Sequence, residues 1–551
     1  MRVPDFTVYP ARKVITLTAG IPGAPAVAVR DGRILGVGTV EELQGWGDAA
    51  VDESFGDKVL IPGFVEAHCH SSEGAMWSFP YVGFFDRTAP DGKRWSGCKT
   101  VDAVLARLRE ADAALDDPNA LLFAWGLDPI YFAGERIMAA HLDRVSTTRP
   151  IFVFHASAHL ATVNTALMQA EGITAETPTP GVVKGANGEP LGELQELPAL
   201  ILARRAIGAL MSASDSPEAI RNMARACVNA GVTTFTDLGS VMLFRPDLVQ
   251  RWQDVTAEDG FPARASLAYG PTLGGPADPA EIARNVTALA GLSTERLRFG
   301  QVKLVLDGSI QGFTACVGWP GYFHAASHAA ELIDPERLKE LVATYHAAGL
   351  TVHAHCNGDL ASESFIAAVE NALRLHPRWD HRHTVQHSQM TTAAQYRRMA
   401  ALGMSANIFS NHIFYWGDQH RGVTLGPDRA ARMDGCATAK AEGVRFALHC
   451  DAPVTPLGGL HLVWCAVNRL TATGEVLGAG ERISALDALR ATTIDAAYTL
   501  RMDHEVGTIE SGKRADFAVL DADPLEVDPA EIKDIPVWGT VVGGQVFPAR
   551  G

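Results

Sequence analysis

The sequence has few features that would place the protein in a membrane, outside the cell or on nucleic acid. It contains no run of about 18 uninterrupted apolar residues, so we expect no transmembrane helix. Its first residues, Met1 to Phe6, lack the apolar centre of a signal peptide. Basic residues are outnumbered, with 47 Lys and Arg against 63 Asp and Glu, and the net charge of -16 argues against a nucleic-acid or anionic-membrane partner.

Cysteine and aromatic residues are also sparse. The 8 cysteines lack a paired spacing, which predicts reduced thiols in a cytoplasmic protein rather than a disulfide framework. Aromatic residues make up 7% and charged residues 20% of the chain, whereas hydrophobic residues make up 47% of its 551 positions. This composition is typical of a globular protein, and the length allows several domains or one large barrel with additions.

Both ends of the chain have the pattern of short β-strands. Near the N-terminus, Asp31-Gly32 separates two apolar runs and favours a hairpin turn. Near the C-terminus, residues 516–520 and 537–542 have the same pattern. Because neither end alone can bury a core, we predict that residues 1–60 and 501–551 together form one small β-sandwich domain.

Between the ends, apolar β-rich runs alternate with capped helical segments, a pattern that predicts an α/β fold with a (β/α)8 TIM-type barrel. The predicted barrel occupies residues 61–500. Its first strand ends at His70, and the count leaves residues 71 to about 230 as one large insertion after that strand. The other seven predicted strands are 232–237, 263–268, 297–303, 350–355, 384–387, 404–408 and 446–450.

Residues that can bind a metal stand at the ends of these apolar runs. His68 and His70 flank Cys69, and because side chains alternate along a strand, both imidazoles point the same way. Active sites of such barrels lie at the C-terminal ends of the strands. Elsewhere, a polar side chain at each apolar strand end would carry a large desolvation cost. The other polar strand ends are Lys303, His355, His387 and Asp451.

Segments around these residues resemble, in order, the motifs of the amidohydrolase superfamily, in the branch of the N-substituted formamide deformylases and YtcJ-like hydrolases. The tail Gly507–Phe517 is similar to the family's return to its small β domain. The resemblance therefore spans nearly the whole chain. The motif segments are Pro62–His70, Val302–Ser309, His355–Asp359, Val385–Gln389 and Asp451–Val454.

This resemblance implies a metal centre. His68, His70 and Asp451 would hold the more buried metal, and His355 and His387 would hold a second metal. Lys303, carboxylated on its amine, would bridge the two metals. A site with one metal instead of two stays open as an alternative. Imidazole and carboxylate ligands suit Zn²⁺ best, with Mn²⁺, Fe²⁺ or Co²⁺ as alternatives. The implied ligands are His68, His70, Lys303, His355, His387 and Asp451.

The resemblance also implies how the site would act. Asp451 would serve as general base and acid, taking a proton from a metal-activated water and passing it to the leaving nitrogen. Two positions depart from the family pattern: Glu66 stands where Asp is usual, and Gln386 where Glu is common. We expect both to be structural, and we expect His353 to pack in the barrel rather than bind metal. The cysteines beside the ligands should face the helices, where cysteine acts as a small hydrophobe.

Aromatic residues on loops predict the walls of the substrate site. Trp77 belongs to an aromatic-rich loop after the first strand, and His412 and Trp416 follow the seventh. Such residues at the catalytic face favour a substrate with an apolar or aromatic portion, with packing inside the insertion as the alternative. Gln311 is a further substrate-binding candidate. His159 resembles a family histidine that faces the reacting centre, and a catalytic and a structural role both stay open.

The chain is therefore predicted to be a metal-dependent hydrolase that cleaves a non-peptide C–N bond, such as that of an N-acyl or N-formyl amine. A carbamate, a lactone or another ester would suit the same site. A non-catalytic scaffold is a remote alternative, because no expected ligand is missing from the sequence. No cluster of arginines marks a polyanionic substrate, so we expect a small, neutral or weakly charged amide. The assembly could be a homodimer.

Overall fold

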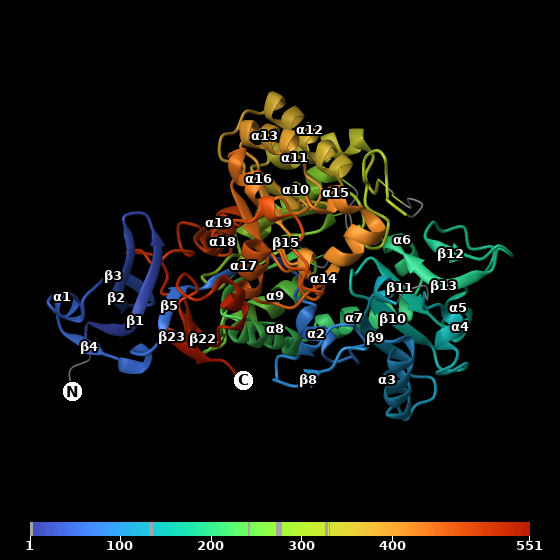
Figure 1. Cartoon of the computed structure of the whole chain (residues 1–551), viewed down its shortest axis with the longest axis horizontal. Helices are drawn as coiled ribbons and strands as arrows, with labels where there is room; N and C mark the ends of the chain where they lie inside the picture. The colour runs from blue at the N-terminus through green and yellow to red at the C-terminus, as the bar shows by residue number, and fades with distance from the viewer. Residues whose placement is uncertain are drawn as a thin grey trace.

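The computed structural model describes residues 4–132, 136–240, 243–271, 278–324, 329 and 331–550. Figure 1 shows three parts: a sheet built from both ends of the chain at the left, a barrel with its helices in the centre, and the insertion at the right. The α/β architecture with a barrel of eight parallel strands confirms that part of the predicted fold class. The boundaries of the three predicted domains remain predictions.

The barrel strands neighbour one another in chain order, and each pair is parallel. All eight predicted strands are present. Backbone hydrogen bonds join the two ends of this series: the Asp451 amide donates to the His68 carbonyl (3.0 Å), and the His70 amide to the Ala452 carbonyl (2.8 Å). The strands are β6 (Phe64–Cys69), β14 (Val232–Ser240), β15 (Arg264–Tyr269), β16 (Leu297–Val305), β17 (Thr351–Cys356), β18 (Thr384–His387), β19 (Ser405–Ile408) and β20 (Phe446–Leu448).

Helices cover the outside of the barrel with their apolar faces. Their starts follow from capping residues: Ser216 accepts from the Ala219 amide, and Asp278 from the Ala280 amide. The cysteines beside the predicted ligands are fully buried in the same core. The helices are α8 (Pro217–Asn229), α9 (Pro246–Thr256), α10 (Pro279–Ala290), α11 (Pro335–Ala347), α12 (Asp359–Leu375), α13 (Ala393–Leu402), α14 (His412–Gln419), α15 (Pro427–Ala430), α16 (Cys436–Ala441), α17 (Gly459–Asn468), α18 (Ala485–Ala491) and α19 (Ile494–Thr499).

The two ends of the chain share one sheet of eight strands. β5 pairs in parallel with β1 and antiparallel with β21, so the C-terminal strands extend the N-terminal ones. The predicted hairpin is present between β2 and β3, where Asp31 and Gly32 both have positive φ. That this sheet forms a sandwich remains a prediction. Its strands are β1 (Phe6–Thr18), β2 (Ile21–Arg30), β3 (Arg33–Gly38), β4 (Ala49–Val51), β5 (Val59–Pro62), β21 (Phe517–Leu520), β22 (Val537–Val542) and β23 (Gln545–Pro548), with helix α1 (Val40–Gln44) beside them.

The chain between β6 and β14 builds a separate sheet of five strands, with its own apolar core. Its strands are β9 (Leu122–Leu127), β10 (Ile151–His155), β11 (Leu160–Val163), β12 (Val182–Lys184) and β13 (Pro190–Gln195), preceded by the short pair β7 (Arg87–Thr88) and β8 (Arg94–Trp95). Its helices are α2 (Glu73–Met76), α3 (Val101–Ala113), α4 (Ala139–Leu142), α5 (Thr165–Glu171), α6 (Glu196–Leu200) and α7 (Arg204–Ser214).

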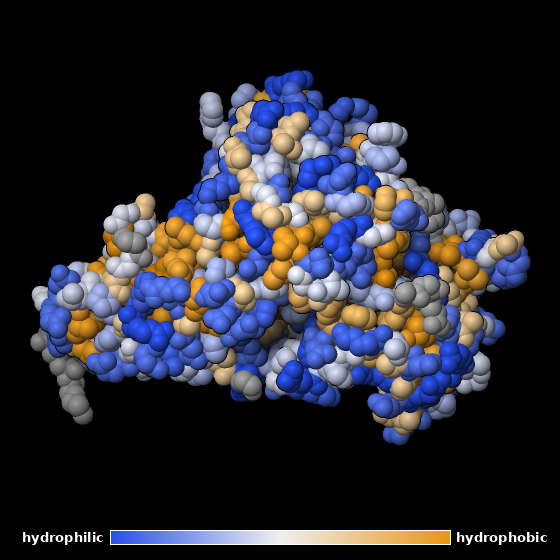
Figure 2. Space-filling view, in the orientation of Figure 1, coloured by the Kyte–Doolittle hydropathy of each residue, from blue (hydrophilic) through white to orange (hydrophobic). Residues whose placement is uncertain are grey.

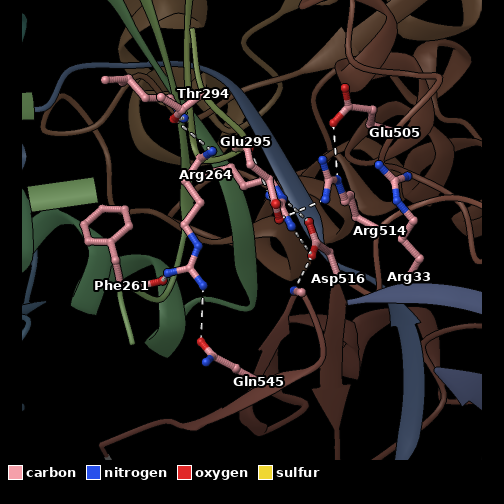
Figure 3. Close-up of polar contacts among 12 residues, drawn as sticks. Arg33, Phe261, Arg264, Thr294, Glu295, Glu505, Arg514, Asp516 and Gln545 are labelled. Atoms are coloured by element: carbon pink, nitrogen blue, oxygen red, sulfur yellow. Dashed lines mark hydrogen bonds and ion pairs between the residues drawn. The ribbon is translucent and has the colours of Figure 1, made fainter. Parts of the chain in front are cut away.

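A buried ion pair joins the terminal sheet to the barrel (Figure 3). Arg264, at the start of β15, donates to Asp516 through Nε (2.6 Å) and Nη2 (3.0 Å). The side chains are 1% and 2% exposed. Nη1 of Arg264 also donates to the carbonyl of Glu295 (3.0 Å), and the Gly543 amide donates to Asp516 (2.8 Å). The paired charges thus satisfy each other away from water, at the end of the barrel opposite the predicted site.

Three buried histidines near the start of β18 are held in their neutral forms by their hydrogen bonds. Nε2 of His346 lies 2.7 Å from the His376 carbonyl, so its Nδ1 accepts from Nε2 of His383 at 2.8 Å. Nδ1 of His383 accepts from the Val352 amide at 3.0 Å. His381 accepts from the His383 amide through Nδ1 (3.0 Å) and donates to the Leu402 carbonyl (2.7 Å). Protonation of any of the three rings would therefore break the hydrogen bond that its Nδ1 accepts.

This cluster predicts a loss of stability in mild acid. Burial lowers the pKa of all three rings, and that of His381 to about 4, below the value near 6.5 of an unfolded histidine. Stability is therefore complete above pH 6.5 and falls as the pH drops from 6.5 towards 4, because the unfolded chain binds more protons. We expect the titration of His381 to lower the free energy of unfolding by about 1–2 kcal/mol between pH 7 and pH 5. Urea unfolding at both pH values would measure this.

His381→Gln should flatten that pH dependence, because glutamine does not titrate. His504→Gln is the control, since His504 is 65% exposed and lies outside the cluster. An equally steep loss of stability in His381→Gln and the unmodified protein would refute the assignment.

The surface is mainly hydrophilic on the face drawn in Figure 2. Hydrophobic residues lie between the hydrophilic ones in several groups. Within the described part of the chain, every helix is too short or too polar to span a bilayer.

Candidate metal centre

The six predicted ligands meet at one cavity of about 370 Å³. They come from five barrel strands that are not all neighbours, yet the barrel brings the C-terminal ends of these strands together. His159, from the insertion, also lines this cavity. The six are His68, His70, Lys303, His355, His387 and Asp451.

The tightest part of the site is formed by the ends of β6 and β20. Oδ1 of Asp451 lies 3.2 Å from Nε2 of His70 and 3.4 Å from Nε2 of His68. These three side chains can place one ligand atom each around a common point. Burial lowers the pKa of His70, but Asp237 and Asp451 outweigh burial and raise it to about 9. The carboxylates therefore give this corner a negative character that favours a cation.

Lys303 reaches the same point from β16. Its Nζ lies 3.2 Å from Nε2 of His68. Burial lowers the pKa of Lys303 to about 7, although the nearby Asp451 raises it. Much of this amine is therefore neutral near pH 7, unlike an ordinary lysine.

His355 and His387 stand on the far side, with their ring centroids 4.3 Å apart. Nε2 of His355 accepts from the side-chain amide of Asn357 at 3.0 Å, and Asn357 also donates to the Gly308 carbonyl. Buried Asp307 fixes this loop by accepting the amides of Asn357 (3.0 Å) and residue 358 (2.8 Å). His355 is thus held by Asn357, just after β17, and through Asn357 by the loop that follows β16.

Gln386 orients one candidate ligand directly. Its Oε1 accepts from Nδ1 of His68 at 2.8 Å and from Asn407 at 2.9 Å, and its Nε2 donates to Nδ1 of His353 at 2.7 Å. The Nε2 of His68 is thereby left with its lone pair facing the cavity. The second departure from the family pattern, Glu66, accepts the amides of His68 (3.1 Å) and Cys450 (3.2 Å), so it ties β6 to β20.

Sequence reasoning missed His449 and Glu196. His449 lies 3.1 Å from Nδ1 of His387 and stacks on His68, which makes it part of a second histidine cluster. It stands two residues before Asp451, so strand alternation could have indicated it. Glu196 accepts from Nδ1 of His159 at 2.8 Å, a contact that no local pattern predicts. Burial lowers the pKa of His159, but Glu196 raises it above its ordinary value.

The four predicted substrate-binding residues lie outside the lining of this cavity as the described residues define it. Trp77 donates to Glu73 at 2.8 Å and packs on Trp125. Trp416 donates to Asp128 at 2.8 Å, and His412 stacks on it. Gln311 is buried in the segment after β16. Of the four, Trp416 joins a barrel loop to the insertion through Asp128.

Apolar side chains form most of the rest of the lining, beside Ser72, Ser157, His159 and Glu196. They come from the insertion, chiefly α6 and α7, and from the barrel strands and loops. The described lining contains one lysine, the candidate ligand Lys303, and no arginine. The apolar lining residues include Met76, Phe154, Leu197, Leu200, Leu210, Leu238, Val305, Leu332 and Val454.

Two orphaned atoms show that the site fits a metal. Among the described residues, Oδ1 of Asp451 and Nε2 of His387 are buried in the cavity without a hydrogen-bond partner. Buried polar atoms rarely lack a partner, and each one costs free energy. A divalent cation would satisfy both, because carboxylate oxygen and imidazole nitrogen are its usual ligands.

Comparison with known proteins gives the same picture. The amidohydrolase family matches residues 56–548 of the chain. Putative amidohydrolase YtcJ of Bacillus subtilis is 27% identical over 95% of both chains, and N-substituted formamide deformylase of Arthrobacter pascens is 26% identical over 96% of both. The crystal structure of an uncharacterized metal-dependent hydrolase from Pyrococcus horikoshii has the same fold, with a TM-score of 0.71 at 18% identity over 95% of this chain and 99% of the other. The chain belongs to the amidohydrolase family and is a metal-dependent hydrolase.

Proposed function

We propose that the chain hydrolyses the C–N bond of a small N-acyl or N-formyl amine that carries an apolar or aromatic group. One observation carries this proposal: six candidate ligands converge on the floor of a cavity whose remaining wall is mainly apolar. The relative that is named a formamide deformylase supports an amide as the substrate.

The positions of the candidate ligands support one assignment of the residues that would hold the metal. His68, His70 and Asp451 would bind one ion, and His355 and His387 a second. Lys303, carboxylated on its largely neutral amine, would bridge them. Zn²⁺ suits these ligands best, with Mn²⁺, Fe²⁺ or Co²⁺ as alternatives. When bound, the metal would polarise the substrate carbonyl and lower the pKa of a water.

Asp451 would move the proton of the reaction. Burial raises the pKa of Asp451, but the contact with His70 outweighs burial and keeps the carboxylate ionised. It would accept a proton from the attacking water and deliver it to the nitrogen as the C–O bond forms and the C–N bond breaks. His159, held by Glu196, would donate a hydrogen bond to the carbonyl oxygen.

Metal analysis of the purified protein beside hydrolysis assays would test this function. The panel would contain formanilide, acetanilide, an aryl carbamate and an aryl lactone. We expect metal in the protein, fastest turnover of the amides, and loss of activity after chelation that Zn²⁺ restores. Equal activity of metal-free and metal-loaded protein would refute the mechanism, and faster turnover of the carbamate or lactone would refute the substrate class.

The apolar wall predicts discrimination against charged substrates. Each neutral amide would be paired with its carboxylate analogue, such as formanilide with 4-formamidobenzoate. An unpaired carboxylate in an apolar cavity costs several kcal/mol, so we expect kcat/KM to be lower for the charged analogue by at least about 10-fold.

Leu210→Arg should narrow the difference in kcat/KM between the neutral and the charged analogue, because Leu210 lines the cavity and an arginine there could pair with the carboxylate. Leu486→Arg is the control, since Leu486 is 48% exposed on α18. A charged analogue that reacts as fast as its neutral partner in the unmodified protein would contradict the prediction.

A further inference from the structure

A buried arginine of the insertion contacts the loop that carries the candidate catalytic aspartate. Nη1 of Arg87, in β7, donates to the carbonyl of Pro453 at 3.0 Å. Pro453 follows Asp451 by two residues and lines the cavity. Arg87 is only 6% exposed, so this hydrogen bond is shielded from competition with water.

The second end of the same guanidinium reaches the loop after β6. Nη2 of Arg87 lies 3.3 Å from Oε2 of Glu73, whose side chain is 5% exposed. The amide of Glu73 donates to the carbonyl of His70 at 3.0 Å. A single side chain therefore connects the segment that follows His70 to the segment that follows Asp451.

Aromatic rings hold this arginine in place. Its guanidinium lies 5.3 Å from the ring centroid of Trp125, 5.7 Å from that of Trp77 and 5.9 Å from that of Tyr81. The indole of Trp77 also donates to Glu73 at 2.8 Å. Rings at these distances attract a cation and restrict its movement. Trp77 and Tyr81, from the loop after the first strand, thus lie beside the arginine and outside the described lining of the cavity.

The loop after β20 is held at three successive residues. The Asp451 amide donates to the His68 carbonyl, the Ala452 carbonyl accepts from the His70 amide at 2.8 Å, and the Pro453 carbonyl accepts from Arg87. Asp451 has a φ of 54°, a conformation that a non-glycine residue keeps only when its surroundings hold it. The contact with Arg87 is the only one of these three that comes from outside the barrel strands and their immediate ends.

We propose that Arg87 is a positioning residue for Asp451: through Pro453 and Glu73, it sets the loop that carries the carboxylate against the histidines of β6. This rests on the role of Asp451 in the proposed function. It also gives the insertion a part in catalysis, because correct folding of the aromatic loop then determines the geometry of the site. A small displacement of a reacting group is enough to slow an enzyme strongly.

Arg87→Met would test the proposal, with Arg149→Met as the matched control. Arg149 is also a buried arginine of the insertion, paired with Asp112, and it donates to three backbone carbonyls away from the cavity. Both variants would be loaded with Co²⁺, and the visible absorption, thermal unfolding, kcat and KM would be compared with those of the unmodified protein.

We expect Arg87→Met to change the Co²⁺ absorption and to lower kcat about 10- to 100-fold, with KM within threefold. Arg149→Met should lower the unfolding temperature but leave the Co²⁺ absorption and kcat unchanged. An unchanged Co²⁺ absorption in folded Arg87→Met would overturn the proposal. This readout needs no substrate, so it remains decisive even if the panel of amides is not hydrolysed and the proposed function fails.

The double variant Arg87→Met/Glu73→Gln separates the two effects of losing the arginine. It removes the buried carboxylate that the single variant leaves unpaired, but it does not restore the contact with Pro453. We expect it to be more stable than Arg87→Met and still to have the altered absorption. Recovery of both absorption and kcat in the double variant would show that Arg87 acts only by neutralising Glu73. If Arg87→Met does not fold, the double variant alone decides.

Discussion

Replacing Asp451 with asparagine should reduce turnover by about 10²- to 10⁴-fold, the range that a lost general base or acid commonly costs. Asparagine has nearly the same shape and keeps an oxygen that can bind metal, but it cannot accept a proton. The carboxylate is well placed for that role: its Oδ1 lies 3.2 Å from His70, has no hydrogen-bond partner and faces the cavity. The change should therefore affect kcat far more than the fold.

Asp128→Asn is the matched control for this substitution. Asp128 is another buried carboxylate, but it accepts from the indole of Trp416 at 2.8 Å and lies outside the described lining of the cavity. Its loss of charge should leave kcat within a few-fold. Steady-state kinetics, metal content and circular dichroism of both variants would measure these effects. Turnover near that of the unmodified protein in a metal-containing Asp451→Asn would show that another group moves the proton.

The barrel and the convergence of the candidate ligands on one cavity could be predicted because their signals are local. A polar residue at the end of an apolar strand is costly unless the strand end serves a site, and this holds for Lys303 and His387 without any knowledge of their neighbours. The eight strands could be counted for the same reason, since buried parallel strands are continuous apolar runs. The barrel topology then places their C-terminal ends together.

The walls of the cavity could not be predicted, because they depend on contacts between distant segments. Trp416 has the composition expected of a substrate-binding loop, but its indole finds Asp128, which lies 288 positions earlier. Trp77 similarly packs against Arg87. The real wall includes leucines of α6 and α7, whose side chains resemble those of any helix core. Which side of such a helix faces the cavity is decided by the docking of the insertion.

Replacing Arg264 with methionine should destabilise the protein by about 3–5 kcal/mol, the usual cost of breaking a buried ion pair by removing one partner. Asp516 would keep the amide of Gly543 as a donor but lose both bonds to the guanidinium. Figure 3 shows that this pair joins β15 to the terminal sheet. The midpoint of urea unfolding would measure the loss, and hydrogen exchange of β21 would show whether the terminal sheet opens first.

Two further variants test whether the buried, unpaired carboxylate causes this loss of stability. Arg397→Met removes a similar two-point contact with Glu442, but Arg397 is 70% exposed, so it should cost no more than about 1 kcal/mol. Arg264→Met/Asp516→Leu removes both buried charges and should regain much of the stability that the single variant loses, since it is the unpaired carboxylate that is expensive. A double variant as unstable as Arg264→Met would show instead that the arginine stabilises this junction by packing.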